Sequence, residues 1–516
     1  MKTILVPLIG DHKENLYQLG LKERESYRAL EARVTSLLSA NTFLRYGQDI
    51  ISRARALLKK KDEGFFAQCV TAYAEGLGIE TSDYMSFINL FELAAHYGQT
   101  YPELKGLLPG CTSMFEKTPE GYLHNRLIDF PLIGIFNEKP RLYYWLLEGK
   151  SPILNYSCEG LAPLFFHAVH DSGFSLALHH KPGKSYHKEG ESIFKITFEG
   201  LFETKSMTDF RRDLRKRISI TKWGYYMMEQ TGSVMCADID GPSINIETFN
   251  LAESSPLIFT NVPLNKDSYG FEHFIRFSQD RELWLREKLA RRKSGQHSLD
   301  LMTDVKDQKA KGWIHPIATL STIGAVQINL RQGLVHVKEG VSALTASDEI
   351  IQFNLSDKHA VKVLKKADEQ TTFEKTWKQA SLAQSAYDQR DWDHAYHHLQ
   401  MAEALAEHPV WKEIFKFYIH VWDFKFVSNK TELALIYRAV KKINPPEILK
   451  DQWMFLCMRM EKRLDLVSTL TVSALSPHLK DQFLQELAAP LPLFNAWMKL
   501  LYPRLEILDV FSPHQR

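Results

Sequence analysis

A cysteine that directly follows a glycine stands at position 111 of this chain of 516 residues. Proline and glycine in the stretch Thr118-Pro119-Glu120-Gly121 predict a tight turn shortly after it, so we expect Cys111 on the first arm of a β-hairpin. The second arm carries Arg126 and Asp129. A thiol, a guanidinium and a carboxylate on one hairpin are side chains that nucleophilic catalysis can use.

A cysteine attacks a carbonyl carbon as its thiolate, and the sequence leaves two routes to that form open. In the first, one of the 20 histidines takes the proton, as in papain-like enzymes that act without cutting their own chain. In the second, cleavage of the bond between Gly110 and Cys111 gives the cysteine a free α-amino group, whose pKa of about 8 suits a base. Considered alone, a cysteine is more often a small buried hydrophobe.

The sequence around Cys111 resembles that of the cysteine N-terminal-nucleophile (Ntn) hydrolases. The likeness is to the autoproteolytic group of acyl-coenzyme A:6-aminopenicillanate acyltransferase. More distantly, it extends to acid ceramidase, N-acylethanolamine amidase and the bile-salt hydrolase and penicillin V acylase group. The matching residues are Gly-Cys-Thr-Ser at 110–113, then Gly121, Arg126, Asp129 and Phe130. The order continues over roughly residues 1–350, with segments 74–79 and 89–93 before the cysteine and 172–178, 259–264 and 278–281 after it.

The resemblance implies roles for the residues of the hairpin. Cys111 would be the nucleophile both of self-cleavage after Gly110 and of catalysis, and Asp129 would hold the α-amino group that cleavage frees. Arg126 would hold the substrate or favour the thiolate. Arg126 and Asp129 have opposite parity along a strand, so a bulge or a strand end is needed for both to reach the site. Without the resemblance, the two would be read as a surface ion pair.

Residues far along the chain would complete the site that the resemblance implies. Asn261 would donate a hydrogen bond to the oxyanion of the tetrahedral intermediate, although alone it reads as a turn residue before Pro263. Arg281 would be a second arginine, with Arg276 as the alternative. His170 stands where many relatives have an asparagine, so either it replaces that hydrogen bond or the oxyanion hole is built differently.

The wider pattern predicts an α+β chain in three parts. Residues 1–110 read as an opening strand followed by helices, and the resemblance makes them a pro-segment. Residues 111–355 carry hairpin signals with helices between them, for which the resemblance implies an αββα sandwich with largely antiparallel sheets. Residues 356–516 read as helical throughout. Helices are expected at 50–58, 65–77, 82–99, 207–219 and 278–294, and strands at 174–180, 233–239, 322–330 and 333–338.

The C-terminal part carries a regular pattern of small and large apolar residues. The spacing of Ala383, Ala386, Trp392, Ala395, Leu399, Ala402 and Pro409 resembles one tetratricopeptide helix pair, while a plain helical bundle is the alternative. The aromatic residues Trp411, Phe415, Phe417, Trp422 and Phe426 are expected in a core rather than in a ligand cage.

Composition narrows the classes of protein. With 64 Lys and Arg against 62 Asp and Glu, the net charge is +2, which gives no reason to expect nucleic acid or an anionic membrane as a partner. The five cysteines have no CxxC spacing, so we expect no disulfide framework and no structural zinc. No cofactor is expected for the chemistry considered above. No apolar run approaches the about 18 residues of a membrane span, and no signal-peptide cleavage site follows the start. A cytoplasmic protein is expected.

Together with these patterns, the resemblance implies an autoprocessed cysteine Ntn amidohydrolase or acyltransferase. It would cleave or transfer an acyl group at a linear, non-peptide amide bond through a Cys111 thioester, with a small acyl amide or acyl thioester as substrate. The competing hypothesis is a catalytically degenerate Ntn fold that binds a protein partner through its C-terminal helices. His170 and the added helices favour that second hypothesis.

Overall fold

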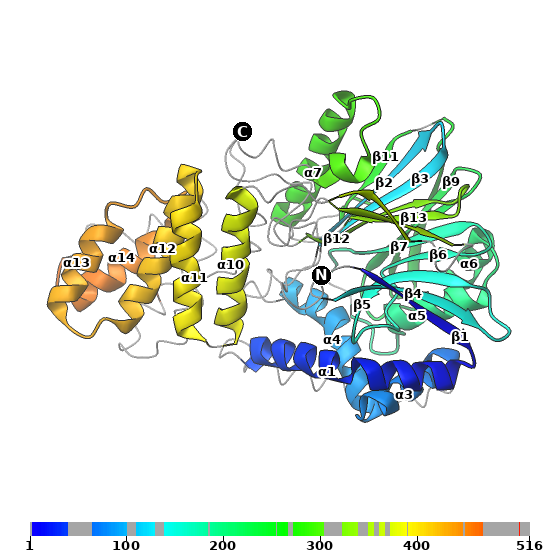
Figure 1. Cartoon of the computed structure of the whole chain (residues 1–516), viewed down its shortest axis with the longest axis horizontal. Coiled ribbons are helices and arrows are strands. Elements are labelled where there is room, and N and C mark those ends of the chain that lie inside the picture. The colour runs from blue at the N-terminus through cyan, green and yellow to red at the C-terminus, as the bar shows by residue number, and fades with distance from the viewer. Residues whose placement is uncertain are drawn as a thin grey trace.

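The computed structural model describes residues 3–39, 64–100, 110–129, 139–183, 186–253, 255–266, 272–303, 322–338, 349–355, 361–366, 372–389, 391–446 and 449–467, with Leu484 and Leu505. Two β-sheets lie against each other with helices on their outer sides, and a further group of helices extends to the left in Figure 1. The helix expected at 50–58 lies outside the described residues.

The first sheet has eight strands, in the order β1-β4-β5-β6-β7-β8-β9-β10. They are β1 (Ile4–Gly10), β4 (Pro140–Leu147), β5 (Ile153–Cys158), β6 (His167–His170), β7 (Phe174–His180), β8 (Trp223–Glu229), β9 (Ser233–Asp240) and β10 (Ser243–Asn250). Only the edge pair β1–β4 of this sheet is parallel. The opening strand and the strands expected at 174–180 and 233–239 are confirmed.

The second sheet has seven strands, in the order β11-β2-β3-β12-β13-β14-β15. They are β11 (Leu257–Phe259), β2 (Gly110–Thr118), β3 (Gly121–Asp129), β12 (Thr322–Asn329), β13 (Leu334–Lys338), β14 (Ile350–Asn354) and β15 (Val361–Lys365). The hairpin predicted around Cys111 is confirmed as β2–β3, and Gly121 takes a φ of +129° at the end of its turn. The pairing expected between 322–330 and 333–338 is confirmed as β12–β13.

Helices cover the outer faces of both sheets. On the first sheet these are α1 (His12–Ser39), α3 (Phe65–Leu77), α4 (Thr81–Thr100), α5 (Ile193–Glu203) and α6 (Met207–Leu214). On the second sheet they are α7 (Glu272–Ala290) and α8 (Ser298–Thr303). Side chains alternate along the hairpin, so Phe115 and Ile128 face the first sheet while Met114 and Leu127 face α7 and α8. The predicted α+β class, with four layers, is confirmed.

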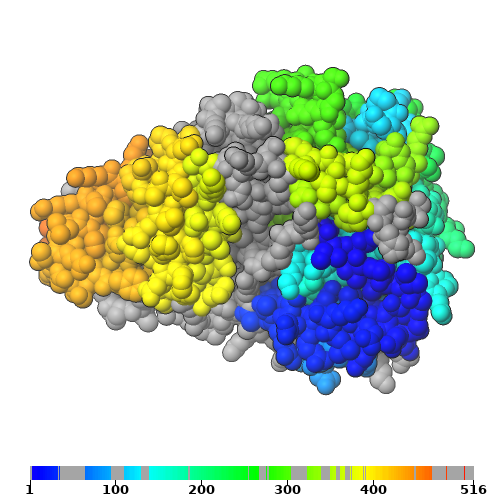
Figure 2. All heavy atoms as spheres, viewed as in Figure 1, coloured from blue at the N-terminus to red at the C-terminus, as the bar shows by residue number. Residues whose placement is uncertain are grey.

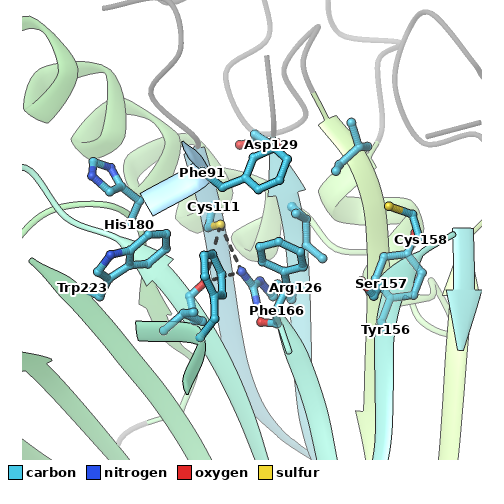
Figure 3. A pocket seen from close by; sticks show the side chains of 14 residues that line it. Phe91, Cys111, Arg126, Asp129, Tyr156, Ser157, Cys158, Phe166, His180 and Trp223 are labelled. Atoms are coloured by element: carbon cyan, nitrogen blue, oxygen red, sulfur yellow. Dashed lines mark hydrogen bonds between the residues drawn. The ribbon is translucent and has the colours of Figure 1, made fainter. Parts of the chain in front are cut away.

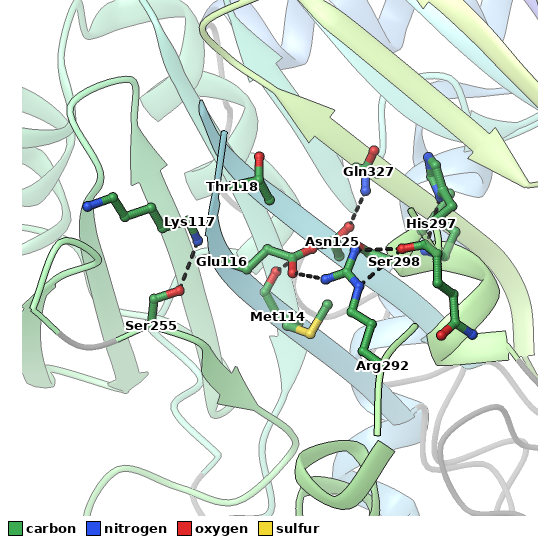
Figure 4. Close-up of polar contacts among 12 residues, drawn as sticks. Met114, Glu116, Lys117, Thr118, Asn125, Ser255, Arg292, His297, Ser298 and Gln327 are labelled. Atoms are coloured by element: carbon green, nitrogen blue, oxygen red, sulfur yellow. Dashed lines mark hydrogen bonds and ion pairs between the residues drawn. The ribbon is translucent and has the colours of Figure 1, made fainter. Parts of the chain in front are cut away.

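A polar network ties the hairpin to its neighbours (Figure 4). The buried carboxylate of Glu116 on β2 accepts hydrogen bonds from Ser298 of α8 and from Arg292, whose Nη1 lies 2.5 Å away. Asn125 on β3 donates to Glu116 at 3.1 Å and accepts from Gln327 of β12 at 2.7 Å. Because charge-assisted hydrogen bonds away from water are the strong ones, this network fixes the strand that carries Cys111.

The segment before Cys111 shares one hydrophobic core with the first sheet. Leu16 of α1, Phe66 of α3 and Tyr84 of α4 pack into the same cluster as Trp145 of β4. Figure 2 shows this N-terminal segment in blue, spread over one side of the sheets. Helices α1 and α3 cross so closely that a Cβ on Gly76 of α3 would lie only 2.1 Å from the Tyr17 carbonyl oxygen of α1. Glycine at position 76 permits this approach. These residues are therefore built into the sandwich.

Two helix bounds differ from the sequence expectation. The helix expected at 207–219 ends at Leu214. Beyond it, the Ile218 carbonyl accepts from the Glu191 N–H, and the Ile220 N–H donates back to the Glu191 carbonyl, so the backbone pairs there rather than continuing the helix. The helix expected at 278–294 is α7, which begins at Glu272 and ends at Ala290. The helices expected at 65–77 and 82–99 are confirmed as α3 and α4.

The C-terminal helices are α10 (Thr372–Asp388), α11 (Trp392–Leu405), α12 (Pro409–Phe426), α13 (Lys430–Val440) and α14 (Lys450–Arg463). The expectation of helix from residue 356 onward is wrong for Val361–Lys365, which form the edge strand β15. Valine at alternate positions suits a strand, and a run of this length is too short to show a helical period.

The α10–α11 pair packs through small side chains. Ala383 of α10 and Ala395 and Ala402 of α11 are buried in one core with the aromatic side chains of α12. The expectation of buried aromatic side chains is confirmed for Trp411, Phe415, Phe417 and Trp422. It is wrong for Phe426, which is 57% exposed. Among the helices that the structure describes, none is long and apolar enough to cross a membrane.

Candidate active site

Cys111 lies one residue into β2, with its side chain on the face toward the first sheet. Nη2 of Arg126 donates to its Sγ at 3.2 Å, and the Leu178 carbonyl oxygen of β7 lies 4.0 Å from the same sulfur (Figure 3). No histidine in the described part of the chain hydrogen-bonds to this sulfur. His180 lines the same pocket, but burial and the charge of Lys181 lower its pKa to about 3, which makes it a weak base.

Arg126 is fully buried and joins the two sheets at the sulfur. Besides Cys111, its guanidinium donates to the carbonyl oxygens of Phe166 and Leu178. Fixed carbonyl acceptors hold the cation in one orientation, so its position beside the sulfur is set by the first sheet. The alternative of a surface ion pair with Asp129 is wrong, because both side chains are buried and Asp129 binds other partners.

Asp129 approaches from the opposite face of the hairpin. Its carboxylate accepts from Nη1 of Arg281 at 2.7 Å and from Oγ1 of Thr322 at 2.6 Å. Gly110 pairs with Asp129 across β2–β3, and a Cβ on Gly110 would lie 2.9 Å from Oδ2 of Asp129. Of the two expected devices, the strand end is the one found: β3 ends at Asp129, and its pairing with β2 runs without a bulge from Gly110–Asp129 to Thr118–Gly121. The register shift nearby lies in β12, between Thr322 and Gly324. The opposite parity of residues 126 and 129 thus brings one to the sulfur and the other to the preceding glycine.

Asn261 binds the backbone of Cys111, and Arg281 binds Asn261. Oδ1 of Asn261 accepts from the Cys111 N–H at 2.9 Å and from Nη2 of Arg281 at 2.6 Å, while Nδ2 donates to the His180 carbonyl at 2.9 Å. Two pure donors and one pure acceptor fix which end of the amide is oxygen. Arg281, from α7, also donates to Oγ1 of Thr112 at 3.3 Å. The oxyanion role of Asn261 stays a prediction.

His170 is not brought to this cysteine. It pairs with Phe174 at the start of β7, four residues from Leu178, or about 13 Å along the strand. Its Nδ1 hydrogen-bonds to Ser172, and burial lowers its pKa to about 4. Arg276, the alternative to Arg281, has a side chain outside the part that the structure describes.

A pocket opens at the sulfur (Figure 3). Apolar side chains from both sheets and from two outer helices form most of its wall: Phe91 of α4, Ile128, Tyr156, Phe166, Leu178, Phe194 of α5, Trp223 and Ile323. Arg126, Asp129, Ser157 and His180 add polar groups. The sequence contained no local sign of this wall, because its members are spread over more than two hundred positions and share only an apolar character.

The chain was compared with known families, curated proteins and solved structures. No family model and no curated protein matches it. Penicillin V acylase from Agrobacterium tumefaciens aligns with 49% of this chain and 90% of its own, at 13% identity and a TM-score of 0.30. An arginine-to-leucine variant of conjugated bile acid hydrolase from Clostridium perfringens aligns with 50% of this chain and 98% of its own, at 14% identity and a TM-score of 0.30.

A buried polar layer lies between the sheets below the sulfur. Ser113, two residues after Cys111 on the same face, hydrogen-bonds to Nε2 of His179 at 2.8 Å. Nδ1 of His179 lies 3.4 Å from the Thr260 carbonyl, directly before Asn261. Burial, with the nearby charges of Arg126 and Lys181, holds the pKa of His179 well below its usual range. A neutral imidazole here links β2, β7 and the Asn261 turn.

Proposed function

We propose that this chain is a cysteine Ntn hydrolase that cuts itself between Gly110 and Cys111 and then cleaves a linear amide. The observation that carries the proposal is the set of groups around one residue. Arg126 donates to the sulfur of Cys111 at 3.2 Å, and Asn261 accepts from its nitrogen at 2.9 Å. A nucleophile with separate partners for its thiol and its amine is what the N-terminal-nucleophile mechanism requires.

Self-cleavage is proposed as a shift of an acyl group from nitrogen to sulfur. The sulfur of Cys111 attacks the carbonyl carbon of Gly110, the carbon–nitrogen bond breaks, and the thiol proton passes to the departing nitrogen. Water then hydrolyses the thioester, which leaves a carboxylate on Gly110 and an amine on Cys111. Arg126 favours the attacking thiolate, and Oδ1 of Asn261 keeps the departing nitrogen in place.

Catalysis on a substrate would repeat these steps with the new amine as base. The amine takes the thiol proton, the thiolate attacks the substrate's carbonyl carbon, and the leaving amine takes the proton as the bond to nitrogen breaks. Nδ2 of Asn261 would donate to the oxyanion, the role that the resemblance implies for it. Asp129, held by Arg281, would balance the charge of the protonated α-amine. Water, or an acceptor amine in an acyl transfer, would then release the acyl group from sulfur.

The pocket wall favours an apolar acyl group as the part of the substrate next to the sulfur. Phe166, Phe194 and Trp223 line the pocket at Cys111, and Phe91 from the segment before the proposed cleavage point completes the wall. Apolar surface of this kind binds by removing water, at roughly 25 cal/mol for each Å² buried.

The test uses two cysteines that line the same pocket, Cys111 and Cys158. Wild-type protein is expected to split at 110/111 in intact-mass analysis and to bind a β-lactone acylating probe covalently. Cys111→Ala is expected to lose both the split and the label. Cys158→Ala is the matched control and should keep both, since burial holds the pKa of the Cys158 thiol well above its usual range. An intact chain at every pH, without a Cys111-dependent label, would instead favour the binding-scaffold hypothesis.

A further inference from the structure

Lys181 is a fully buried lysine directly after β7. Its Nζ donates to the Thr260 carbonyl at 3.0 Å and to the Val262 carbonyl at 2.6 Å. These two carbonyls belong to the residues on either side of Asn261. An ammonium group removed from water needs such acceptors, because burying a charge without them is strongly unfavourable.

The segment 260–264 has further contacts with the same region. Nδ2 of Asn261 donates to the His180 carbonyl at 2.9 Å, and the Leu264 N–H donates to Oδ2 of Asp238 on β9 at 2.7 Å. The other oxygen of Asp238 lies 4.0 Å from Nζ of Lys181. Lys181 therefore binds the 260–262 part of this turn, and its counterion Asp238 binds the turn at Leu264.

The first sheet leaves room for this side chain. A Cβ on Gly224 of β8 would lie 2.5 Å from Cε of Lys181 and 3.0 Å from Oδ1 of Asp238. The next residue but one on β8, Tyr226, accepts a third hydrogen bond from Nζ through its hydroxyl. An ammonium has three N–H donors, and all three have acceptors here.

We infer that Lys181 is a positioning residue, which holds the turn bearing Asn261 at the distance from Cys111 that the reaction needs. The inference rests on the proposed function in one respect, namely that Asn261 serves the chemistry of Cys111. Lys181 acts through Asn261: its hydrogen bonds to the 260–262 turn are to the backbone, and the turn's side chain contacts the cysteine. Without the ammonium, the Val262 carbonyl would lose a donor and the Thr260 carbonyl would keep only the longer contact with Nδ1 of His179 at 3.4 Å, so the turn would shift.

The charge of Lys181 depends on its surroundings, which gives the inference a pH signature. Burial lowers the pKa of Lys181 to about 8, against the opposing effect of Asp238. The titratable groups that face it are Asp238 and Cys236 on β9, Tyr226 on β8, Lys222 directly before β8, Cys111 on β2, and His179 and His180 on β7. A neutral amine has one N–H donor fewer, so the hold on the turn weakens as the pH rises through about 8.

The experiment compares Lys181→Met with Lys338→Met. Lys338 is a second buried lysine, which instead binds Asp300 and Thr303 of α8. Two quantities are measured on the full chain at pH 7. One is hydrogen exchange of residues 255–266 by mass spectrometry, and the other is the rate at which the β-lactone probe labels Cys111. For Lys181→Met we expect exchange to rise and labelling to slow, each by about tenfold or more, the effect of losing a charged buried hydrogen bond. Lys338→Met should leave both unchanged.

The outcomes separate this inference from the proposed function. Wild-type exchange and labelling in Lys181→Met would overturn the inference, and so would faster exchange with an unchanged labelling rate. If wild-type protein is never labelled, the proposed function fails, while exchange alone still decides whether Lys181 holds the turn.

Should Lys181→Met fail to fold, Lys181→Arg replaces it. Its guanidinium stays protonated, so exchange corrected for the intrinsic rate should stay low at pH 9.5, whereas it should rise in wild-type protein. The same pH response in both proteins would overturn the inference.

Discussion

Two faces of one strand serve different atoms of Cys111. Arg126 reaches the sulfur from the interior between the sheets. Asn261, in the turn after β11, binds the backbone N–H, and Arg281 joins Asn261 to Asp129, which lies against Gly110 on the opposite face. This division explains why an arginine and an aspartate of opposite parity can both belong to one site. It also explains why the residue before the cysteine has to be glycine, since the carboxylate occupies the space of a side chain.

At this scale, Gly110→Ala is expected to slow the split at 110/111 by about tenfold or more. The added Cβ would lie 2.9 Å from Oδ2 and 3.2 Å from Cβ of Asp129, so either the strand or the carboxylate has to move. Overpacking of this kind costs about 1–3 kcal/mol, and 1.4 kcal/mol is a factor of ten. A time course of intact mass after purification measures it.

The control for that variant is Gly149→Ala, in a turn where nothing lies within 4 Å of the new Cβ. Its φ of +68° makes alanine strained there, which tests whether general destabilisation alone slows the split. Equal rates in Gly110→Ala and wild type would contradict the importance of the contact with Asp129.

At the scale of elements, the sequence predicted those turns and strands whose formation depends on residues close together in the chain. The turn at 118–121 and the strand at 174–180 were predicted from turn residues and short apolar runs, and both are present. The partners of Asp129 were different. Arg281 was expected at the site only through a resemblance, and Thr322 was not expected at all. The pairing of strands and helices that lie far apart in the chain has no pattern in a short stretch of sequence. Lys181 and Phe91 carry no local signal either. Their roles arise from which segments the fold brings together.

Helix α4 gives a prediction about stability, through Glu92. Its carboxylate accepts from the Ile193 N–H at the start of α5 at 3.1 Å and from Thr221 at 3.0 Å. Burial raises its pKa from 4.5 to about 7, so the folded chain binds a proton here that the unfolded chain releases between those pH values. The stability from this group is therefore complete below about pH 4.5 and is lost as the pH rises through about 7, a change on the order of 3 kcal/mol.

Urea unfolding at pH 5 and pH 8 measures this. The free energy of unfolding of wild type should fall relative to that of Glu92→Gln between the two pH values. Glu23 of α1 has its pKa raised to about 7 by burial as well, so the single variant keeps part of the slope. Glu253→Gln, at an exposed position, should follow wild type. A difference between Glu92→Gln and wild type that is the same at both pH values would contradict the role of Glu92.

For the whole molecule, the segments before and after the proposed cleavage point share one hydrophobic core. The described part of the segment before it supplies the edge strand β1, the outer helices α1, α3 and α4, and Phe91 in the pocket wall. The segment after it supplies the hairpin, the turn with Asn261 and the helix with Arg281. A pro-segment that only blocks a site would not need to share the core of the fold that carries the site. Residues 3–39 and 64–100 therefore belong to the fold that carries the proposed site.

We expect the two fragments to stay together after the split. β1 pairs with β4 over seven residues, from Ile4 with Arg141 to Gly10 with Leu147, and α1, α3 and α4 bury their apolar faces against the first sheet. Cleaved protein should elute from gel filtration at the position of uncleaved Cys111→Ala, and native mass spectrometry should give the sum of both fragments. Denaturation followed by removal of the N-terminal fragment should abolish labelling of Cys111, because Phe91 and the outer helices are lost with it. A fragment 111–516 that separates without denaturant and still takes the label would show that the preceding residues are dispensable to the site.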